Sequence, residues 1–162
     1  MGELERTGVR LALDGGTARI GVAACDPRGT LSYPVETIQA RQGPEAVGRR
    51  VLALVAEYDP IEIVVGLPRH LSGAEGASAT LVRERAAWLA GLVTPVPIRL
   101  VDERLTTVTA SRALHEAGRD TRRQRAVIDQ AAAVAVLDHA LDAERATGKP
   151  AGEVVPREGL QA

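Results

Sequence analysis

Residues 8–25 read GVRLALDGGTARIGVAAC, and this stretch decides the fold. The run from Val9 to Leu13 predicts a buried strand that ends at Asp14. Gly15-Gly16 then makes a tight turn easy, because glycine has no Cβ to restrict the backbone. Apolar residues return from Ile20 to Cys25 and predict a second strand. The stretch therefore predicts two neighbouring strands, with a carboxylate at the end of the first.

The rest of the chain extends this start into a mixed sheet. A turn at Asp26-Pro27-Arg28-Gly29 leads to a predicted third strand from Leu31 to Ile38, which completes an antiparallel meander. Apolar spacing beyond it predicts strands at 61–65 and 97–101 and helices at 44–58, 80–92, 106–118 and 126–141. The order predicts an α/β fold with a mixed five-stranded sheet, in which the meander joins parallel strands flanked by helices.

Length and composition limit the class of protein. The 162 residues suit one domain, expected at 8–142, with a short extension at 1–7 and a flexible tail at 143–162. The formal net charge of −1 argues against nonspecific coating of nucleic acid, and an aromatic content of 2% is too low for a base-stacking platform. The single Cys25 excludes an internal disulfide, and no apolar segment is long enough to span a membrane. A cytoplasmic enzyme is expected.

Three carboxylates stand out. Asp14 lies at a strand end, where open α/β sheets present ligands, although it could also simply cap the turn. Asp102 and Glu103 follow the strand at 97–101 with side chains on opposite sides, so one of them is expected to face Asp14; the alternative is an acid at a helix entry. Asp129 interrupts the most apolar helix, where a carboxylate needs a cation or an arginine unless it faces solvent.

These acids predict metal-dependent phosphoryl chemistry. An oxygen-rich site suits Mg²⁺ or Mn²⁺, and two such ions could activate water for attack on a phosphodiester, leaving a 5′-phosphate and a 3′-hydroxyl. Arginines could contact the phosphates, although a charge run is also typical of a solvated helix face. The candidate substrate-binding residues are Arg19, Arg69, Arg104, Arg122, Arg123 and Arg125.

Four stretches resemble the YqgF/RuvX family of bacterial RNase H-like proteins, described as Holliday junction resolvases or pre-ribosomal RNA nucleases. They are LALDGGTARIGVA at 11–23, IVVGLP at 63–68 with Gly73 and Gly76, DERLTT at 102–107 and VIDQAAA at 127–133. The resemblance implies an RNase H-like fold, Mg²⁺ or Mn²⁺, a cytoplasmic location, and Asp14, Glu103 and Asp129 as the catalytic and metal-binding acids. Gly15 departs from the family, which more often has a larger residue there, and this should loosen the turn. Arg69-His70 also departs, where apolar or amide residues are common.

The family leaves two substrates open. One is the 5′ end of pre-16S rRNA; the other is a four-way DNA junction, whose paired cuts require a homodimer. RNA processing ranks first, because no dimer helix is obvious in the sequence. Two further classes compete: a sugar kinase or actin-like ATPase, which needs a second domain that this chain is too short to hold, and a noncatalytic nucleic-acid-binding module, against which the three retained acids argue.

Overall fold

The computed structural model describes residues 3–103 and 122–157. The helix predicted at 106–118 lies outside these residues, and so does Arg104. Six strands form one sheet in the order β3-β2-β1-β4-β5-β6. The strands are β1 (Arg10–Gly15), β2 (Arg19–Cys25), β3 (Ser32–Gln39), β4 (Glu62–Leu67), β5 (Ile98–Asp102) and β6 (Glu153–Val154).

The pairing confirms the predicted mixed sheet. Strands β1, β2 and β3 form the antiparallel meander, and β4 and β5 run parallel to β1. The carboxyl ends of β1, β4 and β5 therefore meet at one edge of the sheet. The sixth strand, β6, pairs antiparallel with β5 and was not predicted, since two residues carry no recognisable alternation.

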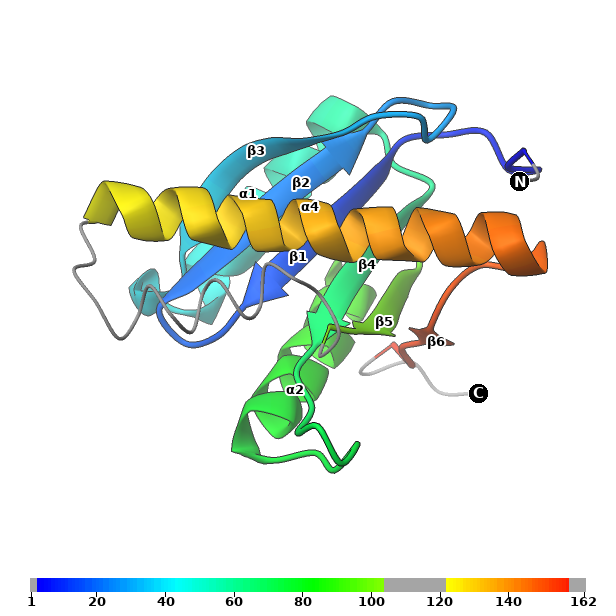
Figure 1. Cartoon of the computed structure of the whole chain (residues 1–162). Coiled ribbons are helices and arrows are strands. Elements are labelled where there is room, and N and C mark those ends of the chain that lie inside the picture. Colours follow the sequence, from blue (N-terminus) through cyan, green and yellow to red (C-terminus); the bar gives the residue numbers. More distant parts are fainter. Residues whose placement is uncertain (1–2, 104–121, 158–162) are drawn as a thin grey trace.

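Helices cover both faces of the sheet. The long helix α4 (Arg122–Thr147) lies across one face, and α1 (Pro44–Tyr58) and α2 (Ala77–Leu92) lie on the other (Figure 1). A short 3-10 helix, η1 (Ala40–Gln42), leads into α1. Within the described residues, no helix combines the length and the apolar character that a membrane span requires. The result is a three-layer α/β architecture.

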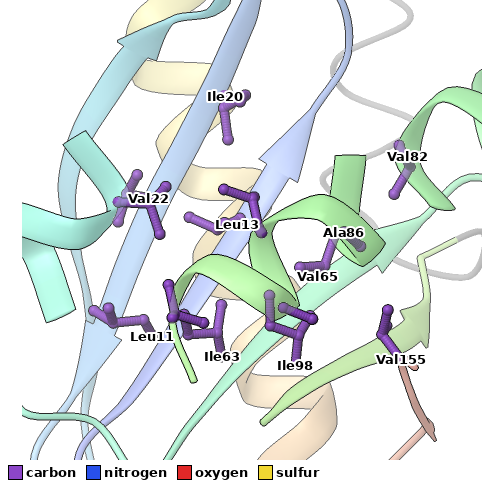
Figure 2. Packing of buried hydrophobic residues seen from close by; sticks show 14 of the residues in the cluster. Leu11, Leu13, Ile20, Val22, Ile63, Val65, Val82, Ala86, Ile98 and Val155 are labelled. Atoms are coloured by element: carbon purple, nitrogen blue, oxygen red, sulfur yellow. The ribbon is translucent and has the colours of Figure 1, made fainter. Parts of the chain in front are cut away.

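Alternation along the strands separates two apolar cores. Leu11 and Leu13 of β1 belong to one core cluster with Leu54 of α1. Ala86 of α2 belongs to the same cluster (Figure 2). Ala12, between them, faces α4 on the opposite side. Because side chains alternate along a strand, Asp14 shares the α4 face with Ala12.

Small residues let α4 lie close to its face of the sheet. Ala12, Ala23 and Ala133 all belong to the core under α4 and are fully buried. Gly21 packs so tightly that an added Cβ would collide with the carbonyl oxygen of Asp129. Since Gly21 pairs with Asp14 in the β1–β2 register, the backbone of α4 at Asp129 is seated beside the end of β1.

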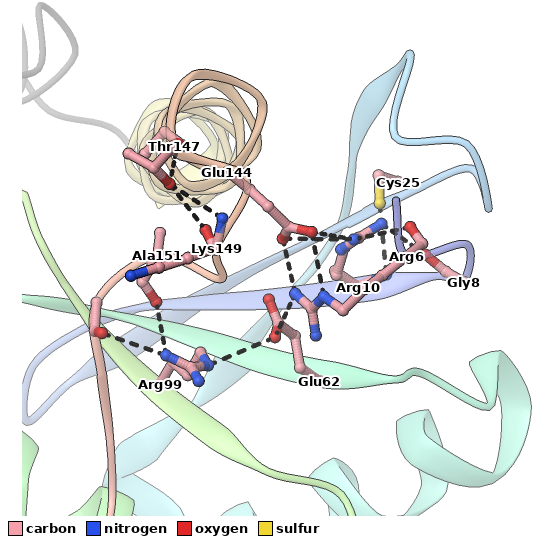
Figure 3. Close-up of polar contacts among 12 residues, drawn as sticks. Arg6, Gly8, Arg10, Cys25, Glu62, Arg99, Glu144, Thr147, Lys149 and Ala151 are labelled. Carbon is pink, nitrogen blue, oxygen red and sulfur yellow. Dashed lines mark hydrogen bonds and ion pairs between the residues drawn. The ribbon is translucent and has the colours of Figure 1, made fainter. Parts of the chain in front are cut away.

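A buried charge network holds the other end of α4 (Figure 3). Glu144 accepts a hydrogen bond of 2.7 Å from Arg6 and lies 3.3 Å from Nη2 of Arg10. Arg6 also lies 2.9 Å from Glu62, at the start of β4. Arg10 is 1% exposed, so its charge depends on these partners.

The chain after Asp142 differs from the expected frayed tail. Helix α4 continues to Thr147, because Glu144 is drawn into the charge network. Val155 is buried at 6% exposure, and its N–H donates to the carbonyl of Ile98 at 2.9 Å. The division of the chain into an extension, a domain and a tail stays a prediction, but residues 143–157 include a helix end and a strand.

Candidate active site

Asp14 and Glu103 meet over Gly66, which lies on the strand between them. Asp14 is 2% exposed on β1, and Glu103 is 9% exposed just after β5. A Cβ added to Gly66 would lie 2.6 Å from Oδ1 of Asp14 and 2.8 Å from Oε2 of Glu103. The two carboxylate oxygens therefore converge on the space that the missing side chain of Gly66 leaves on β4.

Asp102 and Glu103 point to opposite sides, as expected. Glu103 shares the α4 side with Val101, and its backbone N–H donates to the carbonyl of Leu67 at 3.3 Å. Asp102 instead lies 4.0 Å from Nη1 of Arg69. The carboxylate that faces Asp14 is that of Glu103.

Asp129 projects from α4 and is 6% exposed. Its Oδ2 accepts a hydrogen bond of 2.6 Å from Nε of Arg19, on β2. Sequence reasoning required a cation or an arginine beside this carboxylate, and the structure supplies the arginine. Arg19 was predicted to contact phosphate, and here it contacts a protein carboxylate.

The donor set fits a divalent cation in part. Carboxylate oxygens are the ligands that Mg²⁺ and Mn²⁺ prefer, and Asp14 and Glu103 present two that converge. In the described part of the chain, no three His, Cys, Asp or Glu side chains are gathered closely enough to hold a metal ion. Asp129 lies on the same face of the sheet, but its carboxylate is engaged by Arg19.

Arg85 was missed by sequence reasoning. It reaches from α2 to the turn after Asp14 and donates to the carbonyls of Gly15 at 2.8 Å and Gly16 at 2.7 Å. Burial lowers the pKa of Arg85, and the nearby negative charge of Asp14 opposes that shift. No sequence signal links residues 70 positions apart.

The Gly15 turn is closely packed. A Cβ on Gly15 would lie 2.8 Å from Cα of Ile20, so the backbone packs closely there. Arg85 holds both carbonyls of the turn in addition. These contacts hold the turn in place; that glycine makes it looser than a larger residue would stays a prediction.

The remaining candidate arginines differ in their surroundings, and some lie outside the described residues. Arg69 lies 3.4 Å from Glu75 and near Asp102. Arg125, near the start of α4, has a buried Nε without a hydrogen-bond partner among the residues the structure describes. Arg104 and the side chains of Arg122 and Arg123 lie outside the description. Phosphate contacts by all of these stay a prediction.

Comparison with solved structures confirms the fold class. Thermus thermophilus RuvC in complex with a Holliday junction substrate superimposes with a TM-score of 0.52 at 21% identity, over 89% of this chain and 99% of that one. A second T. thermophilus RuvC structure gives a TM-score of 0.51, also at 21% identity, over 88% of this chain and 99% of that one. The domain is thus an RNase H-like α/β fold, as predicted.

The chain belongs to the RuvX family, whose model, described as a Holliday junction resolvase, matches residues 8–143. A Streptomyces coelicolor protein is 57% identical over 93% of this chain and 89% of its own length. A Nocardioides protein is 56% identical over 93% of this chain and 97% of its own length. Both carry the name "Putative pre-16S rRNA nuclease". The predicted family and the predicted enzyme class, a nuclease, are confirmed.

Proposed function

We propose that this chain is a divalent-metal-dependent endonuclease that processes the 5′ end of pre-16S rRNA in the cytoplasm. The observation that carries the proposal is the convergence of Asp14 and Glu103 over Gly66 in a member of the RuvX family. The names of close relatives support the RNA substrate. Both acids come from strand ends, where α/β folds present their reactive groups.

Each acid has a distinct role in this proposal. Asp14 and Glu103 would hold Mg²⁺ or Mn²⁺, and Asp129, now paired with Arg19, would be the third carboxylate ligand. The ions, one or two of them, supply activation of water and neutralisation of the charge on the phosphodiester. Arg85 keeps the backbone after Asp14 fixed, so that this carboxylate keeps its direction. Rigid placement of the acids lowers the reorganisation needed during the reaction.

Arginines near the acids contact the substrate backbone. Arg19 and Arg125 lie on the same side as Asp129, and Arg69 follows the end of β4. Guanidinium groups suit phosphate because they donate two hydrogen bonds in one plane. We expect these contacts to position the RNA without reading its sequence.

Cleavage of four-way DNA junctions is the second candidate. It is favoured by the description of the family model, which names a Holliday junction resolvase. Paired symmetric cuts would require a homodimer with two active sites at a fixed separation. A noncatalytic nucleic-acid-binding module ranks third, because it leaves the convergent carboxylates unused.

One assay separates these functions. A labelled pre-16S rRNA fragment and a labelled four-way junction are incubated with Mg²⁺, Mn²⁺ or EDTA. Asp14→Asn is the inactive variant, and Asp138→Asn, an exposed change on α4, is the matched control. Metal-dependent cutting of the RNA alone supports the proposal, and paired nicks in the junction support the second candidate. Cutting of neither, or equal cutting by Asp14→Asn, contradicts the metal site.

A further inference from the structure

A hollow lies between α1, α2 and the turn that follows Asp14. Its volume is about 360 Å³, within the range of small-molecule pockets. The walls are mostly apolar and come from Val47 of α1 and Leu81 and Trp88 of α2. Thr17, which follows the Gly15-Gly16 turn, also lines the hollow. It will be called the Trp88 pocket.

The Trp88 pocket is preformed. Trp88 packs against α1 at Gly48, where an added Cβ would lie 2.6 Å from Cη2 of the indole. Gly48 is buried, so the ring is fixed between the two helices. A fixed aromatic wall costs little conformational entropy when a planar ligand stacks on it.

Arg85 links the Trp88 pocket to the turn that follows Asp14. The Arg85 side chain lines the pocket and also binds the carbonyls of Gly15 and Gly16. Asp14 is the residue before this turn, and its charge acts on the guanidinium of Arg85. Asp14 faces the α4 side of the sheet and the pocket lies on the α1/α2 side, so a strand with a phosphate at Asp14 would reach the pocket by passing over the Gly15-Gly16 turn.

We propose that the Trp88 pocket receives one unpaired base of the RNA strand, next to the phosphate that is cut. This inference rests on the proposed function. Proteins recognise unstacked RNA bases by stacking them on aromatic rings and on arginine planes, and Trp88 and Arg85 supply both. The apolar walls suit a flat base; of the two charged residues in the lining, Arg85 borders the turn and Glu84 is exposed.

A pocket for one base is compatible with the low aromatic content. Trp88 is the only tryptophan among 162 residues, and two tyrosines complete the aromatic set. This composition excludes a platform that stacks several bases, but one base requires one ring. The enzyme would thus select an unpaired nucleotide at one position beside the cut and tolerate any sequence elsewhere.

The fluorescence of Trp88 reports directly on binding of a base in the pocket, since Trp88 is the only tryptophan in the sequence. The Asp14→Asn protein is titrated with a 5′-end pre-16S rRNA fragment in Mg²⁺, while anisotropy of a dye on the RNA reports binding. Fragments with one abasic nucleotide, moved through the unpaired positions, are compared. We expect fluorescence quenching by the intact RNA and its loss for one abasic position near the cut. Binding with quenching that no abasic position changes, or with no quenching, overturns the proposal.

A second variant pair tests the pocket without relying on fluorescence. Glu84 is exposed and lines the pocket, so Glu84→Phe should fill its mouth without disturbing the core. Glu57→Phe makes the same change at an exposed position near the far end of α1. We expect Glu84→Phe to weaken binding of the intact RNA about tenfold, as loss of one stacked base would. The same variant should bind the abasic RNA as the parent protein does.

If both Phe variants bind the intact RNA equally well, the proposal that the Trp88 pocket holds a base is contradicted. Failure of the proposed function gives a different pattern. In that case the unmodified protein neither cuts nor binds the RNA, and the anisotropy of the dye does not change.

Discussion

The guanidinium of Arg19 donates from Nε to Oδ2 of Asp129 at 2.6 Å and ties β2 to α4. A nearly buried carboxylate is thereby satisfied by the protein itself. In the proposed mechanism the same carboxylate also binds a cation, so Arg19 and the cation compete for Asp129. Arg19 would thus stabilise the metal-free protein and weaken metal binding.

Replacement of Arg19 tests this competition. Arg19→Gln should lower the free energy of unfolding without metal by about 1–3 kcal/mol, because a buried acceptor loses its charged donor. Mn²⁺ should then raise the Tm of the variant more than that of the parent, since no arginine has to be displaced. Arg50→Gln is the control, because Arg50 pairs with Glu36 at the surface. Arg50→Gln should lower the free energy of unfolding by less than about 1 kcal/mol. Equal Mn²⁺ effects on Arg19→Gln and parent would refute the competition.

Gly66 is expected to be required for activity more than for folding. In Gly66→Ala the new methyl group must displace the oxygens of Asp14 and Glu103, which would lie within 2.6 and 2.8 Å of it. RNA cleavage should fall at least about 100-fold, as for other displaced catalytic groups. Gly16→Ala serves as the control, because its Cβ would have no atom within 4 Å. Cleavage rates measure activity, and thermal melts show whether each variant is folded. Near-normal cleavage by a folded Gly66→Ala would show that the two carboxylates do not act together.

Arg85 should not be replaceable by lysine. Lysine keeps the charge but lacks the planar pair of donors that holds the carbonyls of Gly15 and Gly16. Arg85→Lys should lower the rate constant of RNA cleavage about tenfold or more, as loss of a fixed geometry does. Arg83→Lys on the same helix changes only pairs with Glu75 and Glu153, and it should keep the parent rate. Single-turnover cleavage is measured for Arg85→Lys and Arg83→Lys. Equal rates for the two variants would show that Arg85 has no role in the active site.

The stability of the protein should fall in acid because of Glu144. Burial alone would raise the pKa of Glu144, but hydrogen bonds from Arg6 and the charges of Arg10 and Arg6 outweigh it and lower the pKa below the ordinary 4.5. A lowered folded pKa means that the contribution to stability is complete above about pH 4.5 and is lost as the pH falls through the folded value. Urea unfolding of the parent and of Glu144→Gln between pH 3 and 7 tests this. The difference should be largest at neutral pH and shrink in acid; a constant difference would contradict the assignment, and Glu57→Gln should follow the parent.

Much of the fold could be predicted from local patterns. Alternation in β1 and the turn at Gly15-Gly16 placed Asp14 at a strand end, and the strand before Glu103 did the same for the second acid. These predictions succeeded because short apolar runs and turn residues act locally. The resemblance to the RuvX family then selected the same acids.

The missed features depend on contacts between distant residues. Arg85 reaches Gly15 only because α2 packs behind β1. In the sequence, the end of α4 resembles a charged surface segment, but in the structure Glu144 forms a buried ion pair with Arg10. Strand β6 has too few residues for any pattern, and it forms because Val155 fills a place in the core. Local sequence carries no information on such pairings.

Two ion pairs with the sheet, one at Asp129 and one at Glu144, fix the position of helix α4 along its axis. Asp129 and Glu144 are separated by about 22 Å at the usual helical rise, and each meets an arginine of the sheet. One residue inserted between them would rotate one end by about 100° and draw one of the two acids away from its partner. Insertions and deletions within this part of α4 should therefore be excluded by selection.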